Sequence, residues 1–373
     1  MANDTGIEYN VRPLLFKRAL KTLINMLEIS DISVDGYESV KRAYDADSGL
    51  LAFISVHSTV LGPALGGMRL WDYANEEEAL TDVLRLSKGM TYKAACAGLN
   101  LGGGKAVIFG TPAMKSQAFF EAMGDFVESF QGSYITAEDV NTKVEDLGVV
   151  ATRTSHAVGL AGKSGNPSPK TAWGTFIGLK ATLEEVYGSD SCAGKVIAVE
   201  GAGSVGSIYA EFVAKEGGKV LVADINEDSA RRVAESTGGT VVSPEEIRKV
   251  KCDVYAPCAL GGSVNAETIP EFQCKAIVGA ANNQLLTEEH GESLRQLGIV
   301  YAPDYVVNAA GLINVYDELA EGGYREERAM EKMNSIRTNL HQIFLISKEE
   351  GISTAVAADR FAERRIDTVL ASK

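Results

Sequence analysis

The sequence is poor in the residues on which metal centres, disulfide frameworks and histidine-based catalysis depend. It has 5 cysteines and 4 histidines among 373 residues. The cysteines are odd in number, scattered and without a Cys-x-x-Cys pair, which argues against a disulfide framework or a zinc site and favours free thiols in a reducing cytoplasm. We expect the closest pair, Cys252 and Cys258, to be buried free thiols. No histidine adjoins a carboxylate in a recognisable catalytic frame, so we expect packing or surface histidines and no bound metal.

Long apolar runs and an excess of positive charge are also missing. No stretch is long enough to span a bilayer, and the N-terminus lacks the basic start, apolar core and small-residue cleavage site of a secretory signal. The formal net charge is −14 and the sequence pI is near 4.9. These values argue against nucleic acid or an anionic membrane as a partner. We therefore expect a cytoplasmic protein that binds a small molecule.

One N-terminal segment alternates basic and apolar residues at helical spacing. This segment, residues 12–29, reads RPLLFKRALKTLINMLEI. The pattern predicts an amphipathic helix that packs on the body of the protein or on another subunit. A helix lying on a membrane surface is the alternative interpretation.

Length and composition suit two soluble domains, since 45% of the residues are apolar and 23% are charged. Strand-like and helix-like runs alternate along the chain, which predicts an α/β fold. A segment rich in Gly, Ser and Pro at 159–174 marks the crossing between the domains. We expect a first domain at 1–160, in which 1–30 is an extra segment, a second domain at 161–350, and a C-terminal segment at 351–373 that packs back on the first.

The expected elements follow from hydrophobic periodicity and from capping and turn residues. Asn75 followed by Glu78 resembles a capping box at the start of a helix. Short β-rich runs after residue 195 predict a doubly wound parallel sheet. The other expected elements are a strand at 50–58, a helix at 75–98, a glycine-rich loop before a strand at 105–110, a helix at about 116–131, a strand at 132–139, a helix at 171–188, and one long helix at about 325–350 that ends before Gly351.

The stretch GLNLGGGKAVIFG, residues 98–110, has three consecutive glycines followed by a lysine. A phosphate-binding loop requires Gly-x-x-x-x-Gly-Lys-Ser/Thr. Here Leu99 stands where the first glycine belongs, and Ala106 stands where the metal-binding hydroxyl belongs. The stretch is therefore not a nucleoside-triphosphate loop, and another reason is needed for a lysine surrounded by glycine.

A second glycine motif carries the signs of a dinucleotide site. In VIAVEGAGSVGSIYAEFVAKEGGKVLVADIN an apolar strand leads into Gly-x-Gly-x-x-Gly, a helix and a second strand that ends in an acid. The glycines allow the tight turn, the approach of a pyrophosphate and close helix–strand packing, and the helix N-terminus favours phosphate. The terminal carboxylate favours NAD over NADP; a plain βαβ turn is the alternative. The predicted cofactor-binding residues here are Gly201, Ala202, Gly203, Ser204, Val205, Gly206 and Asp224.

Two lysines and an acid form a candidate catalytic set. Lys93 and Lys105 lie close in sequence, and Asp139 ends the strand expected at 132–139. A dehydrogenase acting on an amino acid needs a cation for the substrate carboxylate and a base near the α-carbon. A desolvated lysine beside a second cation and a carboxylate can act as that base. Two surface lysines and a glycine-rich turn remain the alternative at this point.

Several long segments resemble one enzyme family, the glutamate, leucine, valine and phenylalanine dehydrogenases, and within it the leucine dehydrogenase branch. They are LGPALGGMRLW, GMTYKAACAGLNLGGGKAVI, YITAEDV, GNPSPKTAWG, DVYAPCALGGSVN, GAANNQL, GIVYAPDYVVNAAGLINV and VAADRFAERRI. The resemblance covers residues from about 30 to 370. It implies NAD-dependent, reversible oxidative deamination of an L-amino acid to its 2-oxo acid and ammonia, by a homo-oligomer with a substrate domain and a Rossmann-type NAD-binding domain.

The resemblance also implies roles for individual residues. Lys105 corresponds to the lysine that activates the attacking water, and Asp139 to the acid that moves protons at the substrate amine. Lys93 corresponds to the lysine that binds the substrate carboxylate, with help from backbone, and Asn283 lies near both substrate and nicotinamide. The substrate-binding residues implied in this way are Lys93, Gly66, Gly67, Leu65, Met90, Ala137, Val158, Asn283, Leu312 and Val315; Asn283 also joins the cofactor site.

The side-chain pocket carries mixed signals about the substrate. Glutamate-specific relatives have a lysine where this chain has Leu65, so an apolar amino acid is expected. Ala137 is the residue of leucine-type enzymes, whereas Leu312 is the phenylalanine-type choice and Val158 replaces a common threonine. We expect leucine, valine or isoleucine as substrate. A phenylalanine or tryptophan dehydrogenase is the alternative within the family, and a noncatalytic NAD-binding regulatory protein is the alternative from another class.

Overall fold

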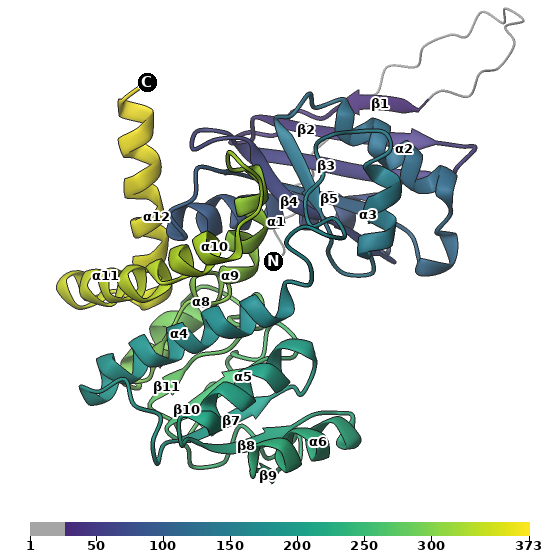
Figure 1. Cartoon of the computed structure of the whole chain (residues 1–373). Coiled ribbons are helices and arrows are strands. Elements are labelled where there is room, and N and C mark those ends of the chain that lie inside the picture. Colours follow the sequence, from purple (N-terminus) through teal and green to yellow (C-terminus); the bar gives the residue numbers. More distant parts are fainter. Residues whose placement is uncertain (1–26) are drawn as a thin grey trace, which may run out of the picture.

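Two six-stranded sheets organise the residues that the computed structural model describes, 27–373 (Figure 1). The helix expected at 12–29 lies outside the described residues except at its end, where the prediction is wrong. Residues Glu28–Asp31 form an edge strand, β1, which pairs antiparallel with β2. Within the described part of the chain, no helix is both long enough and apolar enough to cross a membrane.

The first sheet is mixed, with strand order β1-β2-β3-β5-β4-β6. The strands from β1 to β5 in this order pair antiparallel, and β4 pairs parallel with both β5 and β6. The strand expected at 50–58 is confirmed as β3, and the one expected at 132–139 is shorter. The bounds are β1 Glu28–Asp31, β2 Ser39–Asp45, β3 Leu50–Ser58, β4 Ala64–Trp71, β5 Gly102–Phe109 and β6 Tyr134–Ala137.

Different helices cover the two faces of this sheet. Successive strand residues point to opposite faces, so Val107 packs on the side of α1 while Ala106 and Ile108 pack on the side of α2. Asn75 caps α1 as expected, because its side chain accepts from the Glu78 N–H at 2.9 Å. The bounds are α1 Glu76–Cys96, η1 Pro112–Met114, α2 Gln117–Glu128 and α3 Val144–Val150.

The expected glycine-rich loop before residue 105 is wrong, because Gly102–Gly104 already belong to β5. Close packing explains these glycines. A Cβ at Gly103 would lie 2.1 Å from the backbone nitrogen of Thr91 in α1, and a Cβ at Gly104 would lie 2.6 Å from the Tyr134 ring in β6. The glycines therefore let α1 and Tyr134 press against the strand that carries Lys105.

The second sheet is entirely parallel, with order β12-β11-β10-β7-β8-β9. The chain starts at central β7, runs out through β8 and β9, and returns to β10 on the other side of β7, so the predicted doubly wound fold is confirmed. Such sheets bind ligands beyond the carboxyl ends of the strands where the order reverses. The bounds are β7 Val196–Glu200, β8 Lys219–Ala223, β9 Thr240–Val241, β10 Val254–Pro257, β11 Ala276–Ile277 and β12 Val300–Tyr301.

The helix expected at 325–350 is two helices, α10 and α11, separated at Asn334. Hydrogen bonds from Asn334 N to Glu331 O and from Arg337 N to Asn334 O span three residues instead of four, and this tighter turn redirects the chain. Gly351 ends α11 with φ 67°, as expected. The bounds are α4 Ser168–Tyr187, α5 Ser204–Lys215, α6 Glu227–Thr237, η2 Ile269–Glu271, α7 Glu289–Gln296, α8 Asp304–Val307, α9 Ala310–Tyr316, η3 Asp317–Leu319, α10 Glu326–Met333, α11 Ser335–Glu350 and α12 Thr354–Ala371.

The last helix, α12, lies against α1 of the first domain (Figure 1). The Arg365 guanidinium donates to the carbonyls of Ala94, Ala95 and Leu99, near the end of α1, at 3.3, 3.2 and 2.7 Å. An arginine satisfies unpaired carbonyls and the negative end of the helix dipole at such a position. The domain boundaries at 160 and 350 stay a prediction.

Candidate active site

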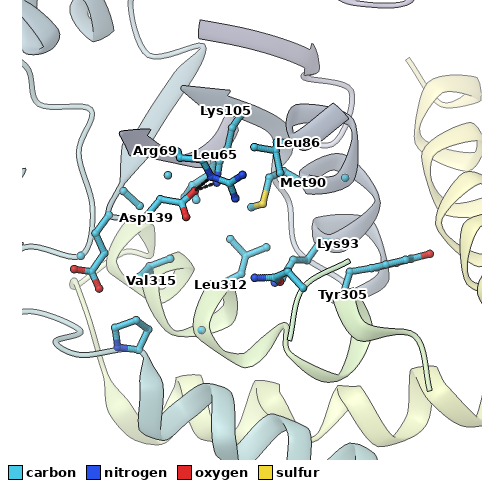
Figure 2. Close-up of a pocket in the computed structure, with 18 of the residues that line it drawn as sticks. Leu65, Arg69, Leu86, Met90, Lys93, Lys105, Asp139, Tyr305, Leu312 and Val315 are labelled. Carbon is cyan, nitrogen blue, oxygen red and sulfur yellow. Dashed lines mark hydrogen bonds and ion pairs between the residues drawn. The ribbon is translucent and has the colours of Figure 1, made fainter. Parts of the chain in front are cut away.

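A cavity of about 270 Å³ lies between the two domains (Figure 2). Its first wall comes from β4, α1, β5 and the end of β6. Its second wall comes from the segment after β11 and from α8 and α9. Charged side chains from the first wall and apolar side chains from both walls therefore face the same space.

Lys105 and Asp139 meet inside this cavity. Lys105 is only 7% exposed, and its Nζ donates to Asp139 Oδ2. Lys105 stands on β5 and Asp139 follows the end of β6, and these two strands flank β4, so the two side chains reach each other across Gly67. A Cβ on Gly67 would lie 2.8 Å from the Asp139 Cβ and 2.4 Å from the carbonyl oxygen of Glu138. Glycine at this position of β4 leaves room for the acid.

Asp139 is held as a carboxylate. Burial by itself raises the pKa of Asp139, but the charges of Lys105 and Arg69 outweigh burial and bring that pKa below its ordinary value. The Val140 N–H also donates to Asp139 Oδ1 at 2.7 Å. An ionised acid next to a lysine can accept and return protons.

Lys93 reaches the cavity from α1 and is bound to the second domain. Its Nζ donates to Asn308 Oδ1 at 2.7 Å, and Asn308 Nδ2 donates to Asn282 Oδ1 at 2.8 Å. Burial lowers the pKa of Lys93 to about 8, although nearby Asp304 favours the charged form. Lys93 is therefore a cation near neutral pH and can attract a carboxylate.

The apolar part of the cavity contains most of the predicted specificity residues. Figure 2 shows Leu312 and Val315 of α9 on the side opposite Lys105. Two predicted residues do not line the cavity. A Cβ on Gly66 would point into Gly104 O at 1.8 Å, and Val158 is buried at 3% exposure. The predicted residues that line the cavity are Leu65, Gly67, Met90, Lys93, Lys105, Ala137, Asp139, Asn283, Leu312 and Val315.

Sequence reasoning missed several polar residues of the site. Arg69 and Asp304 line the cavity, and Asn308 binds Lys93. The other missed polar residues of the lining are Arg85, Glu138, Asn282 and Tyr305. A signal for Arg69 was present, because side chains alternate along a strand and Arg69 follows Leu65 and Gly67 at a spacing of two. No spacing connects Asn308 with Lys93, which are 215 residues apart. The expected buried state of Cys252 and Cys258 is also wrong, since both residues are partly exposed.

The glycine turn after β7 fits a dinucleotide. Gly201 has φ 109°, which suits glycine, and a Cβ on Gly206 would lie 2.0 Å from Gly201 O. Gly203 caps α5, is exposed, and has nothing within 4 Å of its Cβ position, so a ligand can approach the backbone there. Asp224 Oδ2 accepts from the Ala202 N–H at 2.7 Å, which holds the acid beside the turn. Ser204 and Val205 begin α5 and contribute N–H groups of its first turn.

Two family models match the chain. The dimerisation domain of the Glu/Leu/Phe/Val dehydrogenases matches residues 38–156, and the Glutamate/Leucine/Phenylalanine/Valine dehydrogenase model matches residues 221–369. A leucine dehydrogenase from Geobacillus stearothermophilus is 51% identical over 337 residues, which is 89% of this chain and 91% of that protein. An L-tryptophan dehydrogenase from Nostoc punctiforme is 44% identical over 349 residues, or 93% and 98% of the two chains.

Solved structures show the same arrangement of elements. The crystal structure of L-tryptophan dehydrogenase from Nostoc punctiforme aligns with a TM-score of 0.80 at 43% identity, covering 90% of this chain and 97% of that one. A hetero-hexameric glutamate dehydrogenase from Thermus thermophilus aligns with a TM-score of 0.73 at 21% identity, covering 92% and 88%. The second similarity concerns the fold alone.

Proposed function

Because the chain belongs to the glutamate/leucine/phenylalanine/valine dehydrogenase family, and is therefore an amino-acid dehydrogenase, we propose that it deaminates a branched-chain L-amino acid reversibly with NAD. The observation that carries the proposal is the meeting of Lys93, Lys105 and Asp139 in one cavity with an apolar wall. The products are the 2-oxo acid and ammonia. The assembly would be a cytoplasmic homo-oligomer, which the match to a dimerisation domain supports.

The proposed chemistry assigns one task to each charged residue. Lys93 binds the substrate carboxylate, and when bound the nicotinamide accepts the hydride from the α-carbon. Hydride can leave only from the neutral amine, so the ionised Asp139 first takes a proton from the substrate ammonium. Loss of hydride leaves an iminium ion, which a water molecule attacks as the neutral form of Lys105 takes the water's proton. Asp139 then returns its proton to the amine nitrogen, so that ammonia can leave. Walls from both domains keep other water away from the reacting carbon.

The apolar wall supports a branched-chain substrate. Leu65, Met90 and Ala137 come from the first domain, and Leu312 and Val315 from the second. None of these side chains can pair with a charged substrate side chain. Discrimination by apolar contacts is modest, about 1–3 kcal/mol per methylene. An aromatic substrate is the second candidate, supported by the 44% identity to a tryptophan dehydrogenase.

The position of Asp224 supports NAD as the cofactor. Its carboxylate lies at the end of β8 and accepts hydrogen bonds from the turn and from Asn226 N. A carboxylate at this position accepts hydrogen bonds from the ribose hydroxyls of NAD. It repels the additional phosphate of NADP. The residues that would hold NAD are the 201–206 turn, Asp224 and Asn283.

Reduction of NAD and NADP with a panel of L-amino acids at alkaline pH tests the proposal. We expect leucine, valine and isoleucine to give the highest kcat/KM, and NAD to be strongly preferred. Turnover restricted to phenylalanine or tryptophan would replace the substrate assignment. No turnover of any amino acid, with NAD still bound, would favour a noncatalytic NAD-binding protein.

A further inference from the structure

Arg69 is a cavity residue with an unusual hydrogen-bonding state. It stands on β4, and Figure 2 shows its guanidinium beside Lys105 and Asp139. Its Nη1 donates to Asp82 Oδ2 at 3.0 Å, whereas its Nε is buried and has no hydrogen-bond partner. Asp139 Oδ2 lies 3.9 Å from this Nε. Buried donors are nearly always paired, so an unpaired one beside a catalytic acid calls for an explanation.

Asp82 of α1 holds the guanidinium of Arg69 in place through the hydrogen bond from Nη1. The Tyr73 hydroxyl donates to Asp82 Oδ2 at 2.7 Å, and the Asp82 side chain is only 14% exposed. Burial and the neighbouring Asp82 raise the pKa of Tyr73, so its hydroxyl remains a donor. The guanidinium is therefore held in place by a partner other than Asp139, while its Nε–H stays unpaired close to Asp139.

The bond that Asp139 makes with Lys105 cannot persist through the proposed reaction. Lys105 must turn to the water molecule and changes its protonation state as it takes a proton. A buried carboxylate that loses its donor is driven to protonate or to move. Arginine, in contrast, stays charged at every accessible pH, so Arg69 can hold Asp139 while Lys105 acts.

We propose that Arg69 is the positioning residue for Asp139: it favours the ionised form of Asp139 between proton transfers and offers its unpaired Nε–H when Lys105 turns to the water molecule. This inference rests on the proposed function. It assigns no contact between Arg69 and the substrate. Its consequence is that the acid can exchange partners without leaving the site.

Other charged and titratable groups face Asp139 as well. Lys105 comes from β5 and Lys93 from α1, and Tyr134 comes from β6. The charge of Asp139 also contributes to the raised pKa values of Glu138 and Tyr73. Both lysines have other tasks in the proposed reaction, and the tyrosines and the glutamate carry no positive charge. Among these described groups, Arg69 is the one permanent cation.

The pH dependence of kcat/KM for leucine separates positioning from mere folding. The acidic limb is the part of this pH profile in which kcat/KM falls as pH decreases. In Arg69→Gln we expect the acidic limb to move to higher pH by about one unit or more, because Asp139 loses a neighbouring positive charge that favours its ionised form. We expect kcat at neutral pH to fall at least about tenfold. In Arg69→Lys the positive charge is kept, so the acidic limb should lie close to its wild-type pH. Arg153→Gln, which removes an exposed ion pair with Asp125 of the same domain, is the matched control.

An acidic limb that stays in place while kcat falls would overturn the inference. Loss of an arginine that is only structural lowers the amount of active enzyme but leaves the titration of Asp139 unchanged. Should Arg69→Gln fail to fold, Asp82→Asn removes the carboxylate that competes with Asp139 for Arg69, so the acidic limb should move to lower pH. A wild-type protein that turns over no amino acid would overturn the proposed function and this inference with it. An active wild type with an unmoved limb overturns this inference alone.

Discussion

Lys93 and Lys105 face the same cavity but have different hydrogen-bond partners. This difference suits one lysine to substrate binding and the other to proton transfer. Lys105 donates to the carboxylate of Asp139, whereas Lys93 donates to the neutral amide of Asn308. Because an amide carries no charge, burial dominates at Lys93 and lowers its pKa to about 8. The substrate carboxylate would supply the missing negative charge. One lysine is thus suited to binding and the other to proton transfer.

The pKa of Lys93 predicts how substrate binding depends on pH. The cationic form of Lys93 binds the carboxylate, and this form is lost as pH rises through about 8. We therefore expect KM for leucine to be nearly constant below that pH and to rise above it, by about tenfold per unit at the limit. In Lys93→Arg the cation persists, so the rise should disappear. The same rise in both proteins would contradict the assignment of Lys93.

The charged residues of the site differ in how far the sequence could reveal them. Lys105 follows three glycines and Asp139 follows a strand, whereas Lys93 lies in α1 and was a candidate only because it is close in sequence to Lys105. The family resemblance was needed to assign their roles. Arg69 could have been found from the alternation of β4. Asn308 could not, because its contact with Lys93 exists only once the two domains come together.

Among the elements, β4 and β5 show how small residues create the site. Regular helices and strands such as 50–58 were predictable from their periodicity. The sequence suggested a loop at Gly102–Gly104, since glycine usually marks turns, whereas tight packing against α1 is the actual cause. The break at Asn334 was missed as well, because apolar periodicity continues across it.

Gly67→Ala tests the steric role of glycine in β4. The added Cβ would lie 2.8 Å from the Asp139 Cβ and 2.4 Å from Glu138 O, so it must displace the acid. We expect kcat to fall by about 100-fold or more, as for other misplaced catalytic groups. Gly148→Ala in α3 is the control, since nothing lies within 4 Å of its Cβ, and it should stabilise the fold by about 0.5–1 kcal/mol. Equal kcat in both variants would show that Asp139 tolerates the shift.

On the scale of the whole molecule, the site depends on how the two domains are joined. Glu318 of η3 binds the first part of the segment 159–174, where we expect the chain to cross between the domains. The Glu318 carboxylate accepts from the N–H groups of Gly159 and Ser164 at 3.1 Å each, and also from the Ser164 hydroxyl. Gly159 lines the cavity, so this carboxylate holds one part of the cavity wall.

Glu318→Gln should loosen the crossing without changing its shape. An amide replaces one acceptor with a donor that faces other donors, so we expect a loss of about 1–3 kcal/mol in unfolding free energy. KM for the amino acid should rise several-fold while the affinity for NAD changes little. Urea unfolding and steady-state kinetics measure the two effects, and Glu327→Gln on the exposed side of α10 is the control. An unchanged KM would show that the crossing is held by other contacts.

The most direct test of the account is kcat for leucine deamination in Lys105→Ala. The proposed role as the base for water predicts a fall of about 10²–10⁴-fold, with NAD still bound because the 201–206 turn lies in the other domain. Lys115→Ala, which removes a lysine paired with Asp146 outside the cavity, should retain native kcat. Near-native turnover in Lys105→Ala would contradict the assignment of the proton-transfer step.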